Sequence, residues 1–123
     1  FLLVADDILG GLFAINGGAF GQNDLGQMYY LAPDTLSWEP MNCGYSEFVS
    51  WTLGGDIHMF YEPFYWDGWQ EEVSKLNGNQ VFSFFPFLWT KEGKQIENVS
   101  RKVISMEGSY RLTMDMQRQL FEK

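Results

Sequence analysis

The sequence predicts an α+β fold, in which helices pack against a mixed or antiparallel sheet. Short apolar runs that end in turn-forming residues fill the first third of the chain, and segments with helical spacing fill the middle third. With 123 residues and 46% hydrophobic content, residues 1–123 are expected to form a single domain with its own core. No repeat of fixed period and no low-complexity linker indicates an internal boundary.

The first two elements are expected to be strands. Residues 1–5 and 10–15 are apolar runs, and each is followed by turn-forming residues, Asp6-Asp7 and Asn16-Gly17-Gly18. The glycine-rich run 17–21 looks at first like a phosphate-binding loop, but no Lys-Ser or Lys-Thr follows it and the next element is a strand. We therefore expect these glycines to supply turns with positive φ angles.

A hairpin and a later strand come next. Residues 27–32 and 35–39 are typical of strands, and a Pro-Asp turn joins them. Residues 81–85 are apolar at all positions but one, which is typical of a strand covered on both faces, so this strand is expected to be central in the sheet. After a polar loop over residues 91–98, a short edge strand is expected at 102–104.

Helices are expected in the middle third and at the end of the chain. Ser46 is a good N-cap for a helix that Gly54-Gly55 would end. Asp56 is placed to cap a second, short helix, and the apolar spacing of residues 66–76 predicts a third. Ser105 is expected to cap a last helix with two apolar stripes, which suggest that it docks on another element. One stripe holds Tyr110, Met114, Gln117 and Phe121, and the other holds Leu112, Met116 and Leu120.

The charge and the cysteine content limit the possible partners. A net charge of −8 repels the phosphate backbone of nucleic acids. The same charge either steers a basic protein toward this chain or simply keeps this chain soluble. A single cysteine, Cys43, excludes an intrachain disulfide and fits a reducing cytoplasm. No apolar run is long enough to cross a membrane, so we expect no membrane contact.

Metal and catalytic patterns are weak. His58 is the only histidine and Cys43 the only cysteine, and two such ligands are too few for a structural zinc site. The same two residues as a nucleophile pair would lack a third, orienting group and an oxyanion hole. Asp6-Asp7, with Asp24 and Asp34 elsewhere, lack the spacing of a calcium loop and are expected in turns and caps. We expect no catalytic residue, no metal ligand and no cofactor.

Acidic residues near tryptophans leave two alternatives open. Glu71-Glu72 and Glu62 could form the carboxylate pair of a glycoside hydrolase, and Trp66 and Trp69 could hold a sugar ring. On a helix, however, such glutamates more often lie on the solvated face, and tryptophans three residues apart more often lie in the core. A carbohydrate-binding module and a small hydrolase with Cys43 or a glutamate pair therefore remain alternatives.

Several segments spread over nearly the whole chain point to the same family. They are residues 4–7, 16–21, 29–38, 44–48, 60–62, 66–69, 84–89 and 100–102. In these segments the chain resembles the bacterial family called domain of unknown function 2625 (DUF2625). Members of that family are longer at the N-terminus. The resemblance thus implies that this chain is the C-terminal portion of a longer protein and lacks a helix and the first sheet strands.

A weaker likeness is to the SUKH superfamily. There, a turn rich in Asp and Gly precedes a Tyr-containing hairpin with a Pro-Asp-Thr turn, and a helix follows; residues 24–26, 29–30, 33–35 and 46–48 match these pieces. Many SUKH proteins resemble immunity proteins, which bind and neutralise bacterial toxins, often nucleases. The likeness implies a SUKH-like α+β fold and an immunity-like role.

We therefore predict a cytoplasmic, non-enzymatic domain that binds a basic, toxin-like protein. Acidic side chains would steer the partner toward the domain, and exposed aromatic side chains would hold it. The residues expected at this interface are Asp6, Asp7, Asp24, Glu47, Glu62, Glu71, Glu72 and Trp66.

Overall fold

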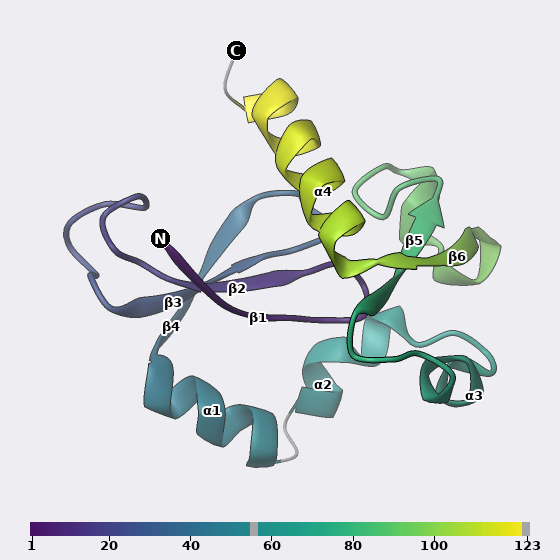
Figure 1. The fold of residues 1–123 in the computed structure, drawn as a ribbon, viewed down its shortest axis with the longest axis horizontal. Coiled ribbons are helices and arrows are strands. Elements are labelled where there is room, and N and C mark those ends of the chain that lie inside the picture. Colours follow the sequence, from purple (N-terminus) through teal and green to yellow (C-terminus); the bar gives the residue numbers. More distant parts are fainter. Residues whose placement is uncertain (55–56, 122–123) are drawn as a thin grey trace.

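The computed structural model describes residues 1–54 and 57–121, apart from the side chains of His58, Met59 and Phe121. The fold is α+β, with antiparallel sheets and helices packed against them, as the sequence predicts (Figure 1). The elements in chain order are β1 (Leu2–Asp6), β2 (Leu12–Ile15), β3 (Gln27–Leu31), β4 (Trp38–Gly44), α1 (Tyr45–Gly54), α2 (Ile57–Tyr61), η1 (Glu62–Phe64), α3 (Trp69–Ser74), β5 (Gln80–Phe85), η2 (Glu92–Lys94), η3 (Ile96–Asn98), β6 (Ser100–Ser105) and α4 (Met106–Phe121).

The larger sheet has four strands in the order β1-β2-β3-β4, and every neighbouring pair is antiparallel. Phe13 of β2 lies opposite Tyr30 of β3, and their rings stack with centroids 4.6 Å apart. Because side chains alternate between the two faces of a strand, Met28 shares this face with Tyr30, and together with Phe48 of α1 they form one hydrophobic core. In Figure 1, α1 and α2 lie on one side of this sheet and α4 lies on the other.

The smaller sheet consists of β5 and β6, and a second core lies against it. Trp66, Phe82 and Phe84 are buried in this core together with Leu88 and Val99. The expectation of a central strand at residues 81–85 is wrong, because within the described residues β5 pairs along its length only with β6. The expectation fails because the apolar pattern reports that both faces of β5 are covered, here by helices and loops, and does not report how many strands pair with its edges. A backbone hydrogen bond of 2.8 Å from Phe82 N–H to Ile8 C=O links β5 to the turn between β1 and β2.

The last helix begins where the sequence predicts. The Ser105 hydroxyl accepts a hydrogen bond of 3.0 Å from the Gly108 N–H, which is the N-cap arrangement. From this cap α4 packs on β5 and β6 and then extends away from the body of the molecule (Figure 1). Leu112 and Leu120, of one predicted stripe, are 39% and 45% exposed, so that stripe is only partly covered.

Three element boundaries differ from those expected. The second strand of the hairpin begins at Trp38, because Leu36 adopts a left-handed φ of 55° and belongs to the turn. The third helix begins at Trp69, because Gly68 with φ 82° interrupts the segment after Trp66. The first helix begins at Tyr45, so Ser46 lies inside it and is not its cap. Gly55 and the predicted cap Asp56 lie outside the described residues.

Candidate functional site

The turn between β1 and β2 is organised around the carboxylate of Asp7. Its Oδ1 accepts hydrogen bonds from the backbone N–H groups of Leu9, at 3.0 Å, and Gly11, at 2.7 Å. The Asp7 N–H in turn donates to the Gly11 C=O at 3.0 Å. An Asp side chain that bonds the backbone a few residues on is a common way to close a turn. The predicted turn role of this residue is therefore confirmed.

Two tyrosines from other elements converge on the second oxygen of the same carboxylate. The hydroxyls of Tyr30, in β3, and Tyr61, in α2, each donate a hydrogen bond of 2.7 Å to Asp7 Oδ2. Burial raises the pKa of Asp7 above its ordinary value, and the hydrogen bonds from Tyr61, Tyr30 and the backbone act in the opposite direction. Burial, followed by the charge of Asp7, also raises the pKa of Tyr30 and of Tyr61. The carboxylate of the half-buried Asp7 thus joins the hairpin, the sheet and α2.

A pocket of about 390 Å³ opens beside this network, and we call it the hairpin pocket. The first hairpin contributes residues 5–9 and Phe13, α1 contributes Phe48 and Thr52, α2 contributes Ile57 and Tyr61, and Phe64, Tyr65, Trp66, Trp69 and Val73 complete the wall. These residues come from both hydrophobic cores, so the pocket lies at the seam between them. Its size is within the usual range of sites for small molecules.

The lining of the hairpin pocket is aromatic and acidic. Seven of the lining side chains are aromatic, and the rings of Tyr65 and Trp69 stack in parallel with centroids 4.1 Å apart. The charged side chains among the described lining residues are Asp6 and Asp7, and none is Lys or Arg. Burial, followed by the charge of Asp7, raises the pKa of Asp6. The pocket therefore combines an apolar wall with negative charge.

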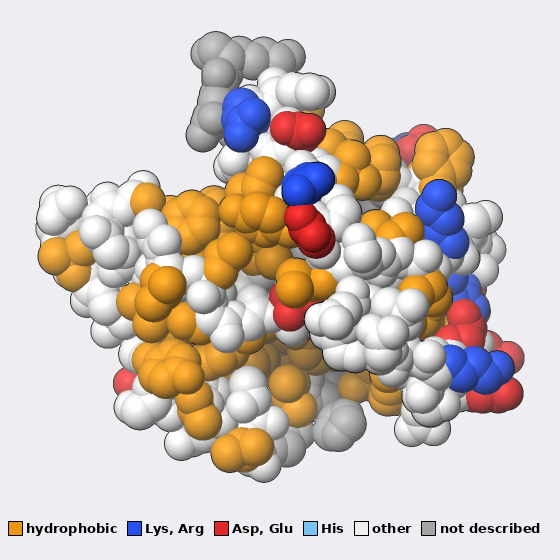
Figure 2. All heavy atoms as spheres, in the orientation of Figure 1, with side chains coloured by type: hydrophobic (Ala, Val, Ile, Leu, Met, Phe, Trp, Pro, Cys, Tyr) orange, Lys and Arg blue, Asp and Glu red, His pale blue; other side chains and the backbone are white. Residues whose placement is uncertain are grey.

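The charge of the surrounding chain is equally one-sided. Residues 1–74 contain eleven Asp or Glu and no Lys or Arg, whereas residues 75–123 contain all eight Lys and Arg and five acidic residues. Residues 1–74 build the larger sheet, α1, α2 and α3, and with them every wall of the hairpin pocket. On the face shown in Figure 2, the Lys and Arg side chains gather over α4 and toward the β5–β6 side, and hydrophobic side chains dominate over the larger sheet. The pocket thus lies in the acidic part of the molecule.

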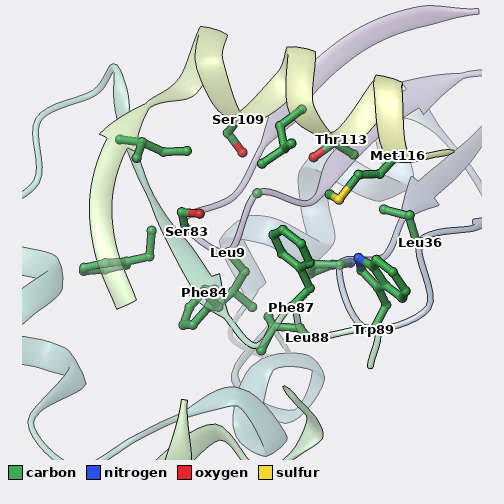
Figure 3. Close-up of a pocket in the computed structure, with 15 residues that line it drawn as sticks. Leu9, Leu36, Ser83, Phe84, Phe87, Leu88, Trp89, Ser109, Thr113 and Met116 are labelled. Atoms are coloured by element: carbon green, nitrogen blue, oxygen red, sulfur yellow. The ribbon is translucent and has the colours of Figure 1, made fainter. Parts of the chain in front are cut away.

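A second cavity lies between α4, β5 and the loop after β5 (Figure 3). Ser109 and Thr113 of α4 face it from one side, and Phe87 and Trp89 face it from the other. The indole N–H of Trp89 is buried and has no hydrogen-bond partner among the described residues. At about 50 Å³ the cavity has room for a few water molecules but not for a substrate. Of these two, only the hairpin pocket has room for a small molecule, and residues of both hydrophobic cores line it, so we take it as the candidate functional site.

The structure brings three of the predicted interface residues together. Asp6, Asp7 and Trp66 all line the hairpin pocket. Trp66 is only 3% exposed, so the expectation that it is an exposed aromatic at an interface is wrong. Its indole N–H donates to Glu72 Oε2 at 2.8 Å, and the Arg101 guanidinium lies 4.5 Å from its ring centroid. The ring is buried because it fills the second core.

Asp24 and Glu47, two other predicted interface residues, do not line the hairpin pocket. Asp24 has a role within its own loop, where its carboxylate accepts hydrogen bonds from the Asn16 amide, at 2.7 Å, and from the Tyr29 hydroxyl, at 2.5 Å. Asn16 also accepts hydrogen bonds from the N–H groups of Gly18 and Phe20. Gly18 has φ 122°, which confirms the predicted turn role of this glycine-rich run. Glu47 is an exposed residue in the first turn of α1.

The carboxylates proposed for glycoside hydrolysis do not form a matched pair. Glu62 is an exposed residue of η1, and Glu71 forms an exposed ion pair with Lys75 at 3.6 Å. Glu72 binds Arg101 through two hydrogen bonds of 2.9 and 2.5 Å. The hydrogen bond from Arg101, followed by that from Trp66, lowers the pKa of Glu72, whereas the general acid of such an enzyme needs a raised pKa.

The thiol of Cys43 lacks the character of a nucleophile. Burial, followed by the charge of Glu47, raises the pKa of this thiol, whereas a nucleophilic cysteine has a lowered one. The side chain of His58 lies outside the described part of the chain. Within the described residues no group of three His, Cys, Asp or Glu side chains is arranged to hold a metal ion. Among the same residues, no helix combines the length and apolar character that a membrane span requires.

Most of the hairpin pocket is missed by reasoning from the sequence. Phe13 and Tyr61 both line this pocket, and Tyr30 and Tyr61 both bond Asp7, although these residues are far apart in the chain. No sequence spacing indicates that they meet. One available signal is the absence of Lys and Arg from residues 1–74, because a segment with charges of one sign indicates an acidic part of the molecule.

Comparisons with other proteins agree with one another. The family model described as "Protein of unknown function DUF2625" matches residues 1–109. The uncharacterized protein YbfG of Escherichia coli (strain K12) is 46% identical over 115 residues, which are 94% of this chain and 51% of that protein. An uncharacterized protein of Haemophilus influenzae (strain Rd) is 42% identical over 110 residues, which are 89% of this chain and 48% of that protein. The chain thus spans about half the length of these curated relatives. No solved structure matches it.

Proposed function

The chain belongs to the DUF2625 family of proteins of unknown function, and from this premise we propose that it is a non-enzymatic domain that binds a basic protein. The observation that carries the proposal is the charge of residues 1–74, which contain eleven acidic and no basic side chains and also supply the lining of one apolar pocket. Such a surface attracts a basic partner over a long range and repels acidic ones.

The proposed partner is a toxin-like protein, and the proposed site of action is the cytoplasm. The support for this part is the likeness of residues 24–26, 29–30, 33–35 and 46–48 to the SUKH superfamily, whose members include immunity proteins. An inhibitor needs no catalytic group of its own, because it acts by covering its target. Membership of a superfamily does not fix a function, so the partner has to be found by experiment.

The apolar part of the interface is expected around the hairpin pocket. Phe64, Tyr65 and Trp69 line the pocket and are half-buried, so they keep surface that a partner can cover. Interfaces commonly combine such aromatic centres with a polar rim. Glu62 and Glu71 are exposed on η1 and α3, the elements that carry Phe64 and Trp69, and Asp6 is exposed at the end of β1. These three residues would supply the acidic rim.

The test is a binding assay with the full-length protein and the products of genes adjacent to its own. We expect one basic protein to be retained, with an affinity that falls steeply as salt concentration rises, because exposed charges are screened. A charge-reversal variant, Glu71→Lys with Asp6→Lys, should weaken binding, whereas the control Glu92→Lys on η2 should not. Retention on a polysaccharide column with no protein captured would instead favour the carbohydrate-binding alternative. Turnover of a glycoside by the purified protein would favour the hydrolase.

A further inference from the structure

The chemistry of the hairpin pocket limits the kind of molecule that can enter it. The pocket of about 390 Å³ is lined mainly by apolar and aromatic side chains, so a ligand must bring an apolar body to gain from burial. The charged groups on the described part of the wall are the carboxylates of Asp6 and Asp7. An anionic ligand would therefore be repelled, and a neutral one would leave this charge without a counterpart.

A positive charge fits both parts of the lining. The two adjacent carboxylates attract a cation directly, and the faces of Trp and Tyr rings attract it through their electron density. The rings of Tyr61, Tyr65 and Trp69 form part of the wall. Residues 1–74 contain no Lys or Arg that could neutralise Asp6 or Asp7. Within the described residues, neither carboxylate forms an ion pair.

We propose that the hairpin pocket binds an organic cation, in which an ammonium or guanidinium group is joined to an apolar body. This inference goes beyond the proposed partner protein, because the cation can be a free small molecule or a side chain that a partner inserts. In both cases the head group lies near Asp6 and Asp7, and the apolar body lies against the wall formed by Phe64, Tyr65 and Trp69.

The roles of the two aspartates in this site differ. Asp7 already accepts four hydrogen bonds, so it contributes its charge and not a direct contact. Asp6 is exposed, and among the described residues no hydrogen bond joins its carboxylate to another side chain. Asp6 is thus the residue that meets the cation.

The test compares two probes that have the same shape and differ in charge, choline and 3,3-dimethyl-1-butanol. Saturation-transfer NMR and a titration with the full chain measure their affinities at neutral pH. We expect choline to bind at least about tenfold more tightly than the alcohol, because only choline gains the charge and ring attractions. Equal affinities, or no binding of choline, would overturn the inference.

Three variants locate the site. Asp6→Asn and Trp69→Leu should each weaken choline binding several-fold, and Asp6→Asn should leave binding of the alcohol unchanged. The matched control Glu92→Gln removes an equal charge from η2, outside the lining of the hairpin pocket, and should leave both affinities unchanged. Circular dichroism checks that each variant is folded. Unaltered choline binding by folded Asp6→Asn would overturn the assignment.

A third probe distinguishes the source of the cation. N-acetyl-arginine methylamide represents an arginine side chain in a peptide, and tighter binding of this probe than of choline indicates a partner's side chain. Tighter binding of choline indicates a free small molecule. Choline binding without any captured protein would support the pocket and contradict the partner-protein proposal, whereas a captured protein without choline binding would do the reverse.

Discussion

The hydroxyl of Tyr61 donates a hydrogen bond of 2.7 Å to Asp7 Oδ2, across 54 residues of chain. Tyr61 ends α2 and Asp7 follows β1, so this bond fixes the position of the helix relative to the first hairpin. The hairpin pocket opens between these two elements. The same contact therefore holds the core together and shapes the candidate site.

Removing the Asp7 carboxylate should destabilise the protein strongly. In Asp7→Ala, the N–H groups of Leu9 and Gly11 and the hydroxyls of Tyr30 and Tyr61 lose their acceptor. Buried donors without partners are costly, so we expect the free energy of unfolding to fall by about 3 kcal/mol or more. Urea unfolding monitored by tryptophan fluorescence measures the change.

Two further variants isolate the bond to Tyr61. Tyr61→Phe removes one donor and leaves the others in place, so it should cost about 1 to 2 kcal/mol. In an Asp7→Ala background the same substitution should cost much less, because its partner is already absent. The control variant is Asp67→Ala, which removes an exposed carboxylate after Trp66 and should leave the cost of Tyr61→Phe unchanged. Equal costs of Tyr61→Phe in both backgrounds would show that the bond contributes nothing.

Gly11 should tolerate no side chain, because Tyr30 and Asp7 leave no room for a Cβ at this residue. A Cβ at position 11 would lie 2.4 Å from the Tyr30 hydroxyl and 2.6 Å from Asp7 Oδ2. Gly11→Ala must displace both groups, and such overpacking commonly costs about 1 to 3 kcal/mol. The matched control is Gly17→Ala, because a Cβ there meets no atom within 4 Å. Thermal unfolding that shows equal Tm values for the two variants would contradict this prediction.

The ion pair between Glu72 and Arg101 should make stability fall in acid. The pKa of Glu72 is lowered in the folded protein from an ordinary value of 4.5. A group with a lowered folded pKa stabilises the protein above its unfolded pKa and loses this contribution as the pH falls through the folded value. We therefore expect the stability difference between the wild type and Arg101→Met to narrow as the pH falls below about 4.5.

The measurement is urea unfolding of both proteins from pH 7 down to pH 3. Methionine keeps the apolar stem that covers Trp66, so the variant removes mainly the charge. Arg111→Met is the control, because its ion pair with Glu107 is exposed on α4 and exposed pairs contribute little. A stability difference between Arg101→Met and the wild type that stays constant over this pH range would contradict the prediction.

Features that depend on neighbouring residues could be predicted from the sequence. The Ser105 cap, the turns at Asp7 and Gly18 and the first three strands follow from hydrogen bonds and apolar alternation within a few positions. The net charge follows directly from the composition. These predictions hold because their causes are local.

Features that depend on packing could not be predicted. The apolar run at residues 81–85 indicates burial, but only the fold decides that β5 pairs with one strand, β6, and not with two. Trp66 gives the same sequence signal whether it fills a core or meets a partner, and here it is 3% exposed.

By itself the sequence determined the α+β class, most of the elements and the acidic character of residues 1–74. Only the tertiary structure decided that Asp7, Tyr30 and Tyr61 meet at one carboxylate beside an aromatic pocket. The physical reason is range: periodicity and capping act over one or two turns of chain, whereas this site forms where the sheet and α2 pack against each other.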